Sequence, residues 1–158
     1  MKKNFVLVLS ILMVSAACTA KSPARTTVPK MAASAYNQKL MIGNKNLQVE
    51  IVNTPEKMAQ GLSGREKLRD GEGMLFVFNQ KQTPAFWMKK MKFDLDLIWA
   101  ADDKIIGMTP NVPAPSSIEK EINLPRYYPP AVVDEVLEVN AGWTEKNRIA
   151  IGDAVSLK

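Results

Sequence analysis

Short segments in which apolar and polar residues alternate limit most strongly what this chain can fold into. In the segment LQVEIVN (47–53), Leu, Val and Ile alternate with polar residues. Such alternation predicts a β-strand with one buried face. The adjacent acids Asp102 and Asp103 follow another alternating segment and favour a hairpin turn. Further strands are expected at 74–78, 86–88, 95–99, 104–106 and 133–139, with a last strand ending at Leu157.

Helices are predicted to be few and short. Thr54 is a good helix cap, Pro55 suits the first turn, and Glu56 favours the positive end of a helix. Gly61 follows within a few turns and ends the pattern, and one more helical turn is expected within 141–147. The sequence therefore predicts a mainly β domain, a compact antiparallel β-barrel or sandwich with one or two short helices.

The N-terminus has the features of an export signal. Lys2 and Lys3 give a positive start, residues 5–14 are apolar, and residues 15–17 are small. The apolar run is shorter than the roughly 20 residues that a membrane-spanning helix needs. We therefore expect residues 1–17 to be a cleaved signal peptide, with an uncleaved anchor as the alternative.

Cys18 directly follows the small residues and resembles the cysteine of a lipobox, although Ser15 stands where that box usually has Leu. We therefore expect Cys18 to be lipidated and to become the mature N-terminus. Ordinary signal cleavage near Ala17 or Ala20 is the competing interpretation. If the host is Gram-negative, Thr19 after the cysteine favours the outer membrane.

Residues 18–45 are rich in Ala, Ser, Thr, Lys and Pro and show no apolar period, so we expect a disordered tether ahead of a single domain at 46–158. Residues 1–49 carry seven of the 21 basic residues and no acid, whereas residues 50–158 hold 14 basic and 16 acidic residues. The domain thus lacks the basic surface that nucleic acid requires. A cationic tether suits anionic lipid head groups.

The chain has no histidine and a single cysteine. An imidazole base, a Ser-His-Asp triad and a His-ligated zinc site are therefore excluded. We expect no cofactor and no bound metal. The one metal considered is Cu(I), which thioethers such as Met88 and Met91 can bind, but core packing is the more common role of methionine.

Four segments in order resemble one family, known as domain of unknown function 192. They are GLSGREKL (61–68), GEGMLFVF (71–78), AFWMKKMKFDLDLIW (85–99) and VLEVNAGWTEKNRIAIGDAV (136–155). The resemblance covers about residues 47–158 and implies a small, mainly β, often exported domain without an established activity. The residues that match the family pattern are Arg65, Trp87, Met88, Lys89, Leu95, Asp96 and Glu138, and those that depart from it are Lys90, Met91 and Asp94.

Two groups of charged residues are candidates for a site. Arg65 could bind a carboxylate or phosphate, or form a structural ion pair with Asp96 or Glu138. Asp94 and Asp96 share one strand face, about 7 Å apart, a spacing that would allow hydrolysis of a glycosidic bond. Exposed strands often carry such paired acids for no chemical reason, so we assign no catalytic residue.

Two groups of aromatic residues are the other candidates. Trp87 and Lys89 are expected on one strand face, where they could line a cleft, although Trp87 could instead pack in the core. The loop 109–131 holds six of the ten prolines and is expected to be functional or disordered. Within it, Tyr127 and Tyr128 have the composition of an interface, or else pin the loop to the domain.

These observations favour a membrane-tethered binding or accessory module of the cell envelope, without catalysis. The alternative is a carboxylate-based hydrolase of envelope glycan, which would need Asp94, Asp96 and Glu138 to share a cleft. Its partners would be the membrane, through the lipid anchor, and an envelope ligand or protein. The residues expected to face the ligand are Arg65, Trp87, Lys89, Asp96, Tyr127, Tyr128 and Glu138.

Overall fold

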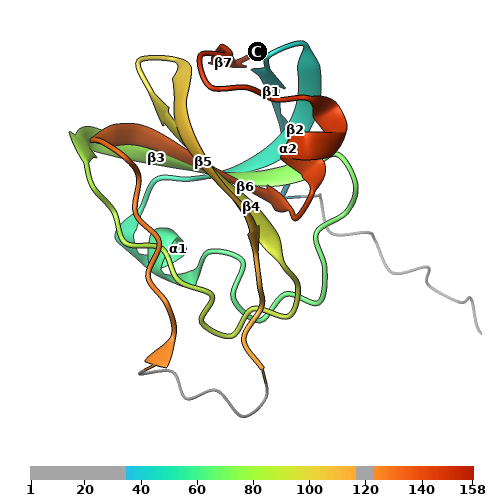
Figure 1. Ribbon diagram of the computed structural model, residues 1–158, viewed down its shortest axis with the longest axis vertical. Coiled ribbons are helices and arrows are strands. Elements are labelled where there is room, and N and C mark those ends of the chain that lie inside the picture. Colours follow the sequence, from blue (N-terminus) through green and yellow to red (C-terminus); the bar gives the residue numbers. More distant parts are fainter. Residues whose placement is uncertain (1–34, 117–122) are drawn as a thin grey trace, which may run out of the picture. The chain divides into compact units, whose positions relative to one another are not determined.

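A seven-stranded sheet organises residues 35–116 and 123–158, which are the residues that the computed structural model describes (Figure 1). The strands are β1 (Gln38–Ile42), β2 (Lys45–Val52), β3 (Glu72–Gln82), β4 (Leu95–Ala101), β5 (Lys104–Val112), β6 (Val133–Asn140) and β7 (Val155–Leu157). The helices are α1 (Pro55–Gln60) and α2 (Trp143–Asn147). The predicted mainly β fold with short helices is confirmed. The predicted signal peptide and Cys18 lie outside the described residues.

The strands lie in the order β5-β4-β6-β3-β2-β1-β7. All neighbours are antiparallel except β2 and β3, which run parallel because α1 carries the chain back between them. The two ends of the sheet also approach each other. The Ile105 amide donates to the Asp153 carbonyl (3.0 Å), and the Val155 amide donates to the Asp103 carbonyl (2.8 Å). The sheet is therefore curled towards a barrel.

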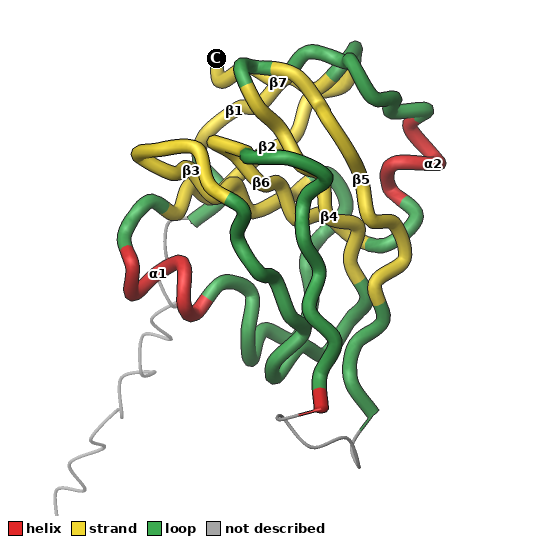
Figure 2. Tube along the Cα trace, turned by 60° about the vertical axis from the view of Figure 1, so that its left-hand side comes forward, coloured by secondary structure: helices red, strands yellow, loops and turns green. Residues whose placement is uncertain are grey.

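Each face of the sheet buries its own core. Inside the curl, strands from both ends contribute Leu40, Leu75, Ile98, Leu137 and other apolar residues. The opposite face buries a second cluster that includes Met74, Phe76, Leu97, Trp99 and Val136. Figures 1 and 2 show α1 and the long loops on one side of the sheet, away from α2 and β7. Among the described residues, no helix is both long and apolar enough to cross a membrane.

Local signals in the sequence placed the turns and the first helix correctly. Thr54 caps α1, its hydroxyl accepting from the Lys57 amide at 3.4 Å, and Pro55 opens the helix. Asp102 and Asp103 both have positive φ, 52° and 59°, in the two-residue turn between β4 and β5. This conformation matches the right-handed twist of a hairpin.

The N-terminal boundary of the domain was predicted too late in the chain. Residues 38–45 were assigned to the tether, but Gln38–Ile42 form β1, which pairs with both β2 and β7. Leu40 and Ile42 are fully buried in the core inside the curl. A five-residue strand carries too short an alternation to be distinguished from a tether until its partner strands are known.

The segment 86–88 was predicted to be a strand, and this was wrong. Only Phe86 pairs, in a single bridge with Tyr127 on the loop before β6. The chain then turns, with a positive φ of 56° at Lys90. Because this segment has one bridge and no ladder of hydrogen bonds, it is not a strand of the sheet. We refer to residues 84–91, which contain it, as the strap.

The sheet also extends further into the proline-rich region than expected. β5 continues to Val112 and includes Pro110. β5 is an edge strand in the strand order, and an edge strand tolerates a proline that cannot donate to a ladder. Residues 117–122 of this loop are outside the described residues.

Candidate functional site

Glu138 is the most unusual polar residue of the fold. It lies on β6, where its strand neighbours are Met74 on β3 and Leu97 on β4. Directly paired residues point to the same face, so its side chain enters the core cluster that contains these two residues. Only 7% of Glu138 is exposed, and its Oε2 atom has no hydrogen-bond partner.

The environment of Glu138 favours its neutral form. Burial raises the pKa of this carboxyl from 4.5 to about 8, although the positive charge of Arg65 works in the opposite direction. Buried polar groups in folded proteins nearly always have a hydrogen-bond partner, and one without a partner calls for an explanation. Near neutral pH, Glu138 is therefore a buried acid that carries its proton and has an unmatched oxygen.

A pocket of about 280 Å³ lies over Glu138, between α1 and the 84–91 strap. Among the described residues that line it, Glu138 is the only acidic or basic one. The lining also contains four aromatic side chains, and we refer to the whole as the Glu138 pocket. The aromatic residues are Phe76, Phe78, Phe86 and Trp87.

The aromatic wall of the pocket is firmly held. The Phe86 ring packs edge-on against Phe76, with centroids 4.9 Å apart, and against Trp99 at 5.6 Å. The Phe86 and Tyr127 backbones exchange two hydrogen bonds, each 2.9 Å long. Across the pocket, the Ser63 hydroxyl donates to the Lys89 carbonyl at 2.8 Å. The segment after α1 and the strap are thus tied together.

Positive charge gathers at the outer side of the strap. The Arg126 guanidinium lies 3.7 Å from the centre of the Trp87 ring, and the Lys89 ammonium lies 5.0 Å from it. Trp87 is half-buried and lines the Glu138 pocket instead of filling the core. Trp87 and Lys89 lie close together, as expected, although they are not on a strand. Their contact with a ligand stays a prediction.

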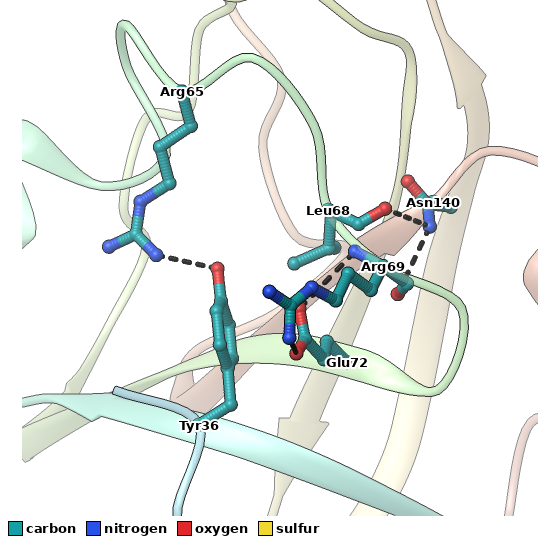
Figure 3. A network of polar contacts seen from close by, with 6 residues as sticks. All are labelled: Tyr36, Arg65, Leu68, Arg69, Glu72 and Asn140. Atoms are coloured by element: carbon teal, nitrogen blue, oxygen red, sulfur yellow. Dashed lines mark hydrogen bonds and ion pairs between the residues drawn. The ribbon is translucent and has the colours of Figure 1, made fainter. Parts of the chain in front are cut away.

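Arg65 pairs with a residue that the sequence did not suggest. Its guanidinium contacts Glu50 on β2 at 2.7 Å and donates to the Tyr36 hydroxyl at 2.5 Å, as Figure 3 shows for Tyr36. Burial lowers the pKa of Arg65, but the hydrogen bond and charge of Glu50 and of Tyr36 raise it overall. The predicted direct ion pair of Arg65 with Asp96 or Glu138 is wrong.

The register of the sheet explains this pairing. Glu50 faces Met74 across β2 and β3, and Met74 faces Glu138 across β3 and β6. The two carboxyls therefore share one row on one face, and Arg65 bonds to Glu50 at one end of it. Glu138 at the other end receives only the longer-range field of Arg65.

Asp96 is not on the pocket face. It pairs with Val139, one residue beyond Glu138, so its side chain enters the opposite face. It is 0% exposed, and its carboxylate accepts from the amides of Asn111, Gly142 and Thr144 and from the Thr144 hydroxyl, at 2.7–3.0 Å. The carboxylate of Asp96 therefore holds the start of α2 in place.

The remaining candidates are dispersed. Asp94 is exposed and accepts from the Ala114 amide at 2.7 Å, so Asp94, Asp96 and Glu138 do not form the acidic cleft that the hydrolase alternative would need. Tyr127 is pinned to the domain through Phe86, whereas Tyr128 is 57% exposed. In the described part of the chain, no three acidic, cysteine or histidine side chains gather as a metal site would need.

Sequence reasoning missed several residues of the site. Phe76, Phe78 and Phe86 line the pocket, and Tyr36 supports Arg65. Aromatic residues in apolar segments give no signal that separates a pocket wall from a core. Tyr36 was hidden because it lies in the stretch assigned to the tether.

The whole domain matches one family model, over residues 38–157. The family is domain of unknown function 192, described as an uncharacterised group of proteins, and the chain belongs to it. The match begins at the first residue of β1, in agreement with the corrected domain boundary. A comparison with curated proteins found no match.

Two solved structures have a similar fold. One, from Sinorhizobium meliloti, is described as a candidate transcription regulator; it is 25% identical, with a TM-score of 0.68 over 76% of this chain and 92% of that one. The other, from Novosphingobium aromaticivorans, has unknown function; it is 24% identical, with a TM-score of 0.67 over 75% of this chain and 83% of that one. The fold is thus shared, and neither description supplies an activity.

The burial of Glu138 predicts an unusual dependence of stability on pH. Because its pKa is raised in the folded state, the protonated carboxyl supports folding fully below about pH 4.5, and this support is lost as the pH rises to about 8. Each pKa unit corresponds to about 1.4 kcal/mol, so the wild type should lose on the order of 3–5 kcal/mol of unfolding free energy over this pH range. The Glu138→Gln variant should not show this loss. Urea unfolding between these pH values measures the difference from wild type.

Glu56→Gln is the matched control, because Glu56 is exposed on the first turn of α1. This control should follow the wild-type pH dependence. A wild-type protein whose stability is flat or rises over this range, in parallel with Glu138→Gln, would show that Glu138 is ionised in the fold.

Proposed function

We propose that this protein is a non-catalytic ligand-binding module held at the cell envelope, and that the Glu138 pocket is its binding site. The observation that carries this proposal is that Glu138 lines an aromatic pocket and that its carboxyl has a buried oxygen, Oε2, with no hydrogen-bond partner. Ligand sites are typically apolar pockets with a few polar groups that orient the ligand. Groups with strongly perturbed pKa values are concentrated at such sites.

The number of carboxyl groups in the described pocket lining favours binding over hydrolysis. Glycoside hydrolysis needs two carboxyl groups flanking the scissile bond. The described lining supplies one, Glu138, while Asp96 points to the other face and Asp94 binds a backbone amide. The alternative of a carboxylate-based glycan hydrolase therefore loses the geometry on which it depended.

Other hollows in the surface lack these features. One of them, with a volume of about 740 Å³, lies beside Lys45, Lys146 and Arg148. None of its described lining residues is buried, so no polar group there is held away from water. The domain also has no excess of positive charge, so we do not extend the description of the S. meliloti protein to DNA binding by this chain.

The envelope location rests on the N-terminal sequence. A positive start, an apolar run and small residues before Cys18 support export and lipidation at the periplasmic or outer face of the envelope. Mass spectrometry of membrane-extracted protein should therefore find an acylated N-terminal Cys18. A soluble product that begins at Thr19 or Lys21 would refute the lipid anchor and leave the pocket proposal standing.

Binding at the pocket can be tested with a panel of single-ring organic compounds, using protein-observed NMR. Compounds that bind should shift the resonances of Phe86, Trp87 and Glu138. Ala59 lines the pocket from α1 and is exposed, so Ala59→Trp should block binding by filling the opening.

Lys57→Trp places the same side chain on the same helix outside the described pocket lining, and it should leave binding intact. If no compound in the panel perturbs the pocket, or if both variants bind as wild type does, the pocket is not the binding site.

A further inference from the structure

We propose that the Glu138 pocket selects an uncharged, ring-sized ligand whose carbonyl oxygen accepts a hydrogen bond from the Glu138 carboxyl. This inference rests on the proposed function and adds the chemical class of the ligand. It follows from three properties of the pocket, which are its unmatched polar group, the lack of a basic residue in its described lining, and its size.

The polar group in need of a partner is the Glu138 carboxyl. Its Oε2 atom is buried and has no hydrogen-bond partner within the protein. Another polar side chain of the lining, Ser63, already donates its hydroxyl hydrogen to the Lys89 carbonyl. A protonated carboxyl is a donor as well as an acceptor, so an acceptor on the ligand would complete what the protein leaves open.

The charges around the pocket disfavour a charged ligand of either sign. No Lys or Arg belongs to the described lining, so a bound anion would lie in an apolar site without a counterion. A cation would need Glu138 to ionise inside the core, where burial disfavours the charged form. Arg65, whose charge acts on Glu138, already bonds to Glu50.

The size of the pocket limits the ligand to about one ring. A volume of about 280 Å³ lies near the lower end of ligand pockets. A cavity of about 150 Å³ is enough for benzene, so the pocket accommodates one ring with a small substituent. Four aromatic side chains give that ring apolar surfaces to pack against.

Four probes with the same ring separate the possibilities. Acetophenone carries a neutral carbonyl, ethylbenzene carries no polar group, benzylamine is a cation, and benzoate is an anion. Dissociation constants measured by NMR titration at about pH 6 should favour acetophenone over ethylbenzene by about three- to tenfold, the gain from one hydrogen bond. Both charged probes should bind more weakly than acetophenone.

The pH dependence and two variants identify Glu138 as the donor. Acetophenone should bind about tenfold more weakly at about pH 9 than at about pH 6, because Glu138 loses its proton in between. Glu138→Gln keeps an amide donor and should retain the preference for acetophenone at both pH values. Glu138→Met has no donor and should bind acetophenone and ethylbenzene equally.

The outcomes separate this inference from the proposed function. If ethylbenzene equals acetophenone in the wild type, or if benzylamine or benzoate binds most tightly, the inference is overturned while the pocket remains a binding site. If none of the four probes binds at the pocket, the proposed function fails with it. A preference for acetophenone that survives in Glu138→Met would also overturn the inference, because its donor would lie elsewhere.

Discussion

The burial of one carboxyl, Glu138, in the middle of the sheet is the constraint on which the candidate site depends. β6 lies between β3 and β4, so a side chain on its covered face is enclosed by strands below and by α1 and the strap above. An isolated ionised carboxylate is too costly in such surroundings, and the pKa of Glu138 rises accordingly. The apolar surroundings of Glu138 are thus the reason that it keeps its proton.

Arg65, whose charge acts on Glu138, is paired with another acid. Arg65 holds Glu50 and Tyr36, and both lie on the N-terminal side of the domain. Had Arg65 bonded to Glu138, the pocket would have contained a buried ion pair with no unmatched atom. Glu50 and Glu138 lie in the same row, but only Glu50 is paired with Arg65. The Glu138 carboxyl therefore remains able to donate a hydrogen bond to a ligand in the pocket.

The other buried acid shows what structural use of a carboxylate looks like. Asp96 accepts three hydrogen bonds from Gly142 and Thr144 at the start of α2 and one from the Asn111 amide on β5, and it is closed off from solvent. Glu138, at a similar depth, has an atom with none. A carboxyl kept for stability alone would be expected to resemble Asp96, since an unsatisfied buried group costs about 1–3 kcal/mol.

Much of the fold could be predicted from local sequence signals, whereas the site could not. Thr54 and Pro55 mark α1, and Asp102 and Asp103 mark a hairpin, because these signals act within a few residues. The pairing of Arg65 with Glu50 depends on the parallel register of β2 and β3, which no local pattern specifies. Likewise, only the register places Asp96 and Glu138 on opposite faces.

The boundary of the domain and the pocket walls were missed for related reasons. β1 is too short to be recognised without its partners β2 and β7. Phe86 was assigned to a strand because its neighbours are apolar, but its position is set by one bridge to Tyr127 more than 40 residues later in the chain. Long-range contacts of this kind are the information that a single sequence does not display.

The central claim is that Glu138 is a neutral acid in the folded protein. The most direct measurement is an NMR titration of its side-chain carboxyl carbon, assigned by comparison with Glu138→Gln. This carbon is expected to titrate with a pKa of about 8. A Glu138 pKa at or below about 4.5 would show that the carboxyl is ionised in the folded protein and cannot donate a hydrogen bond in the pocket.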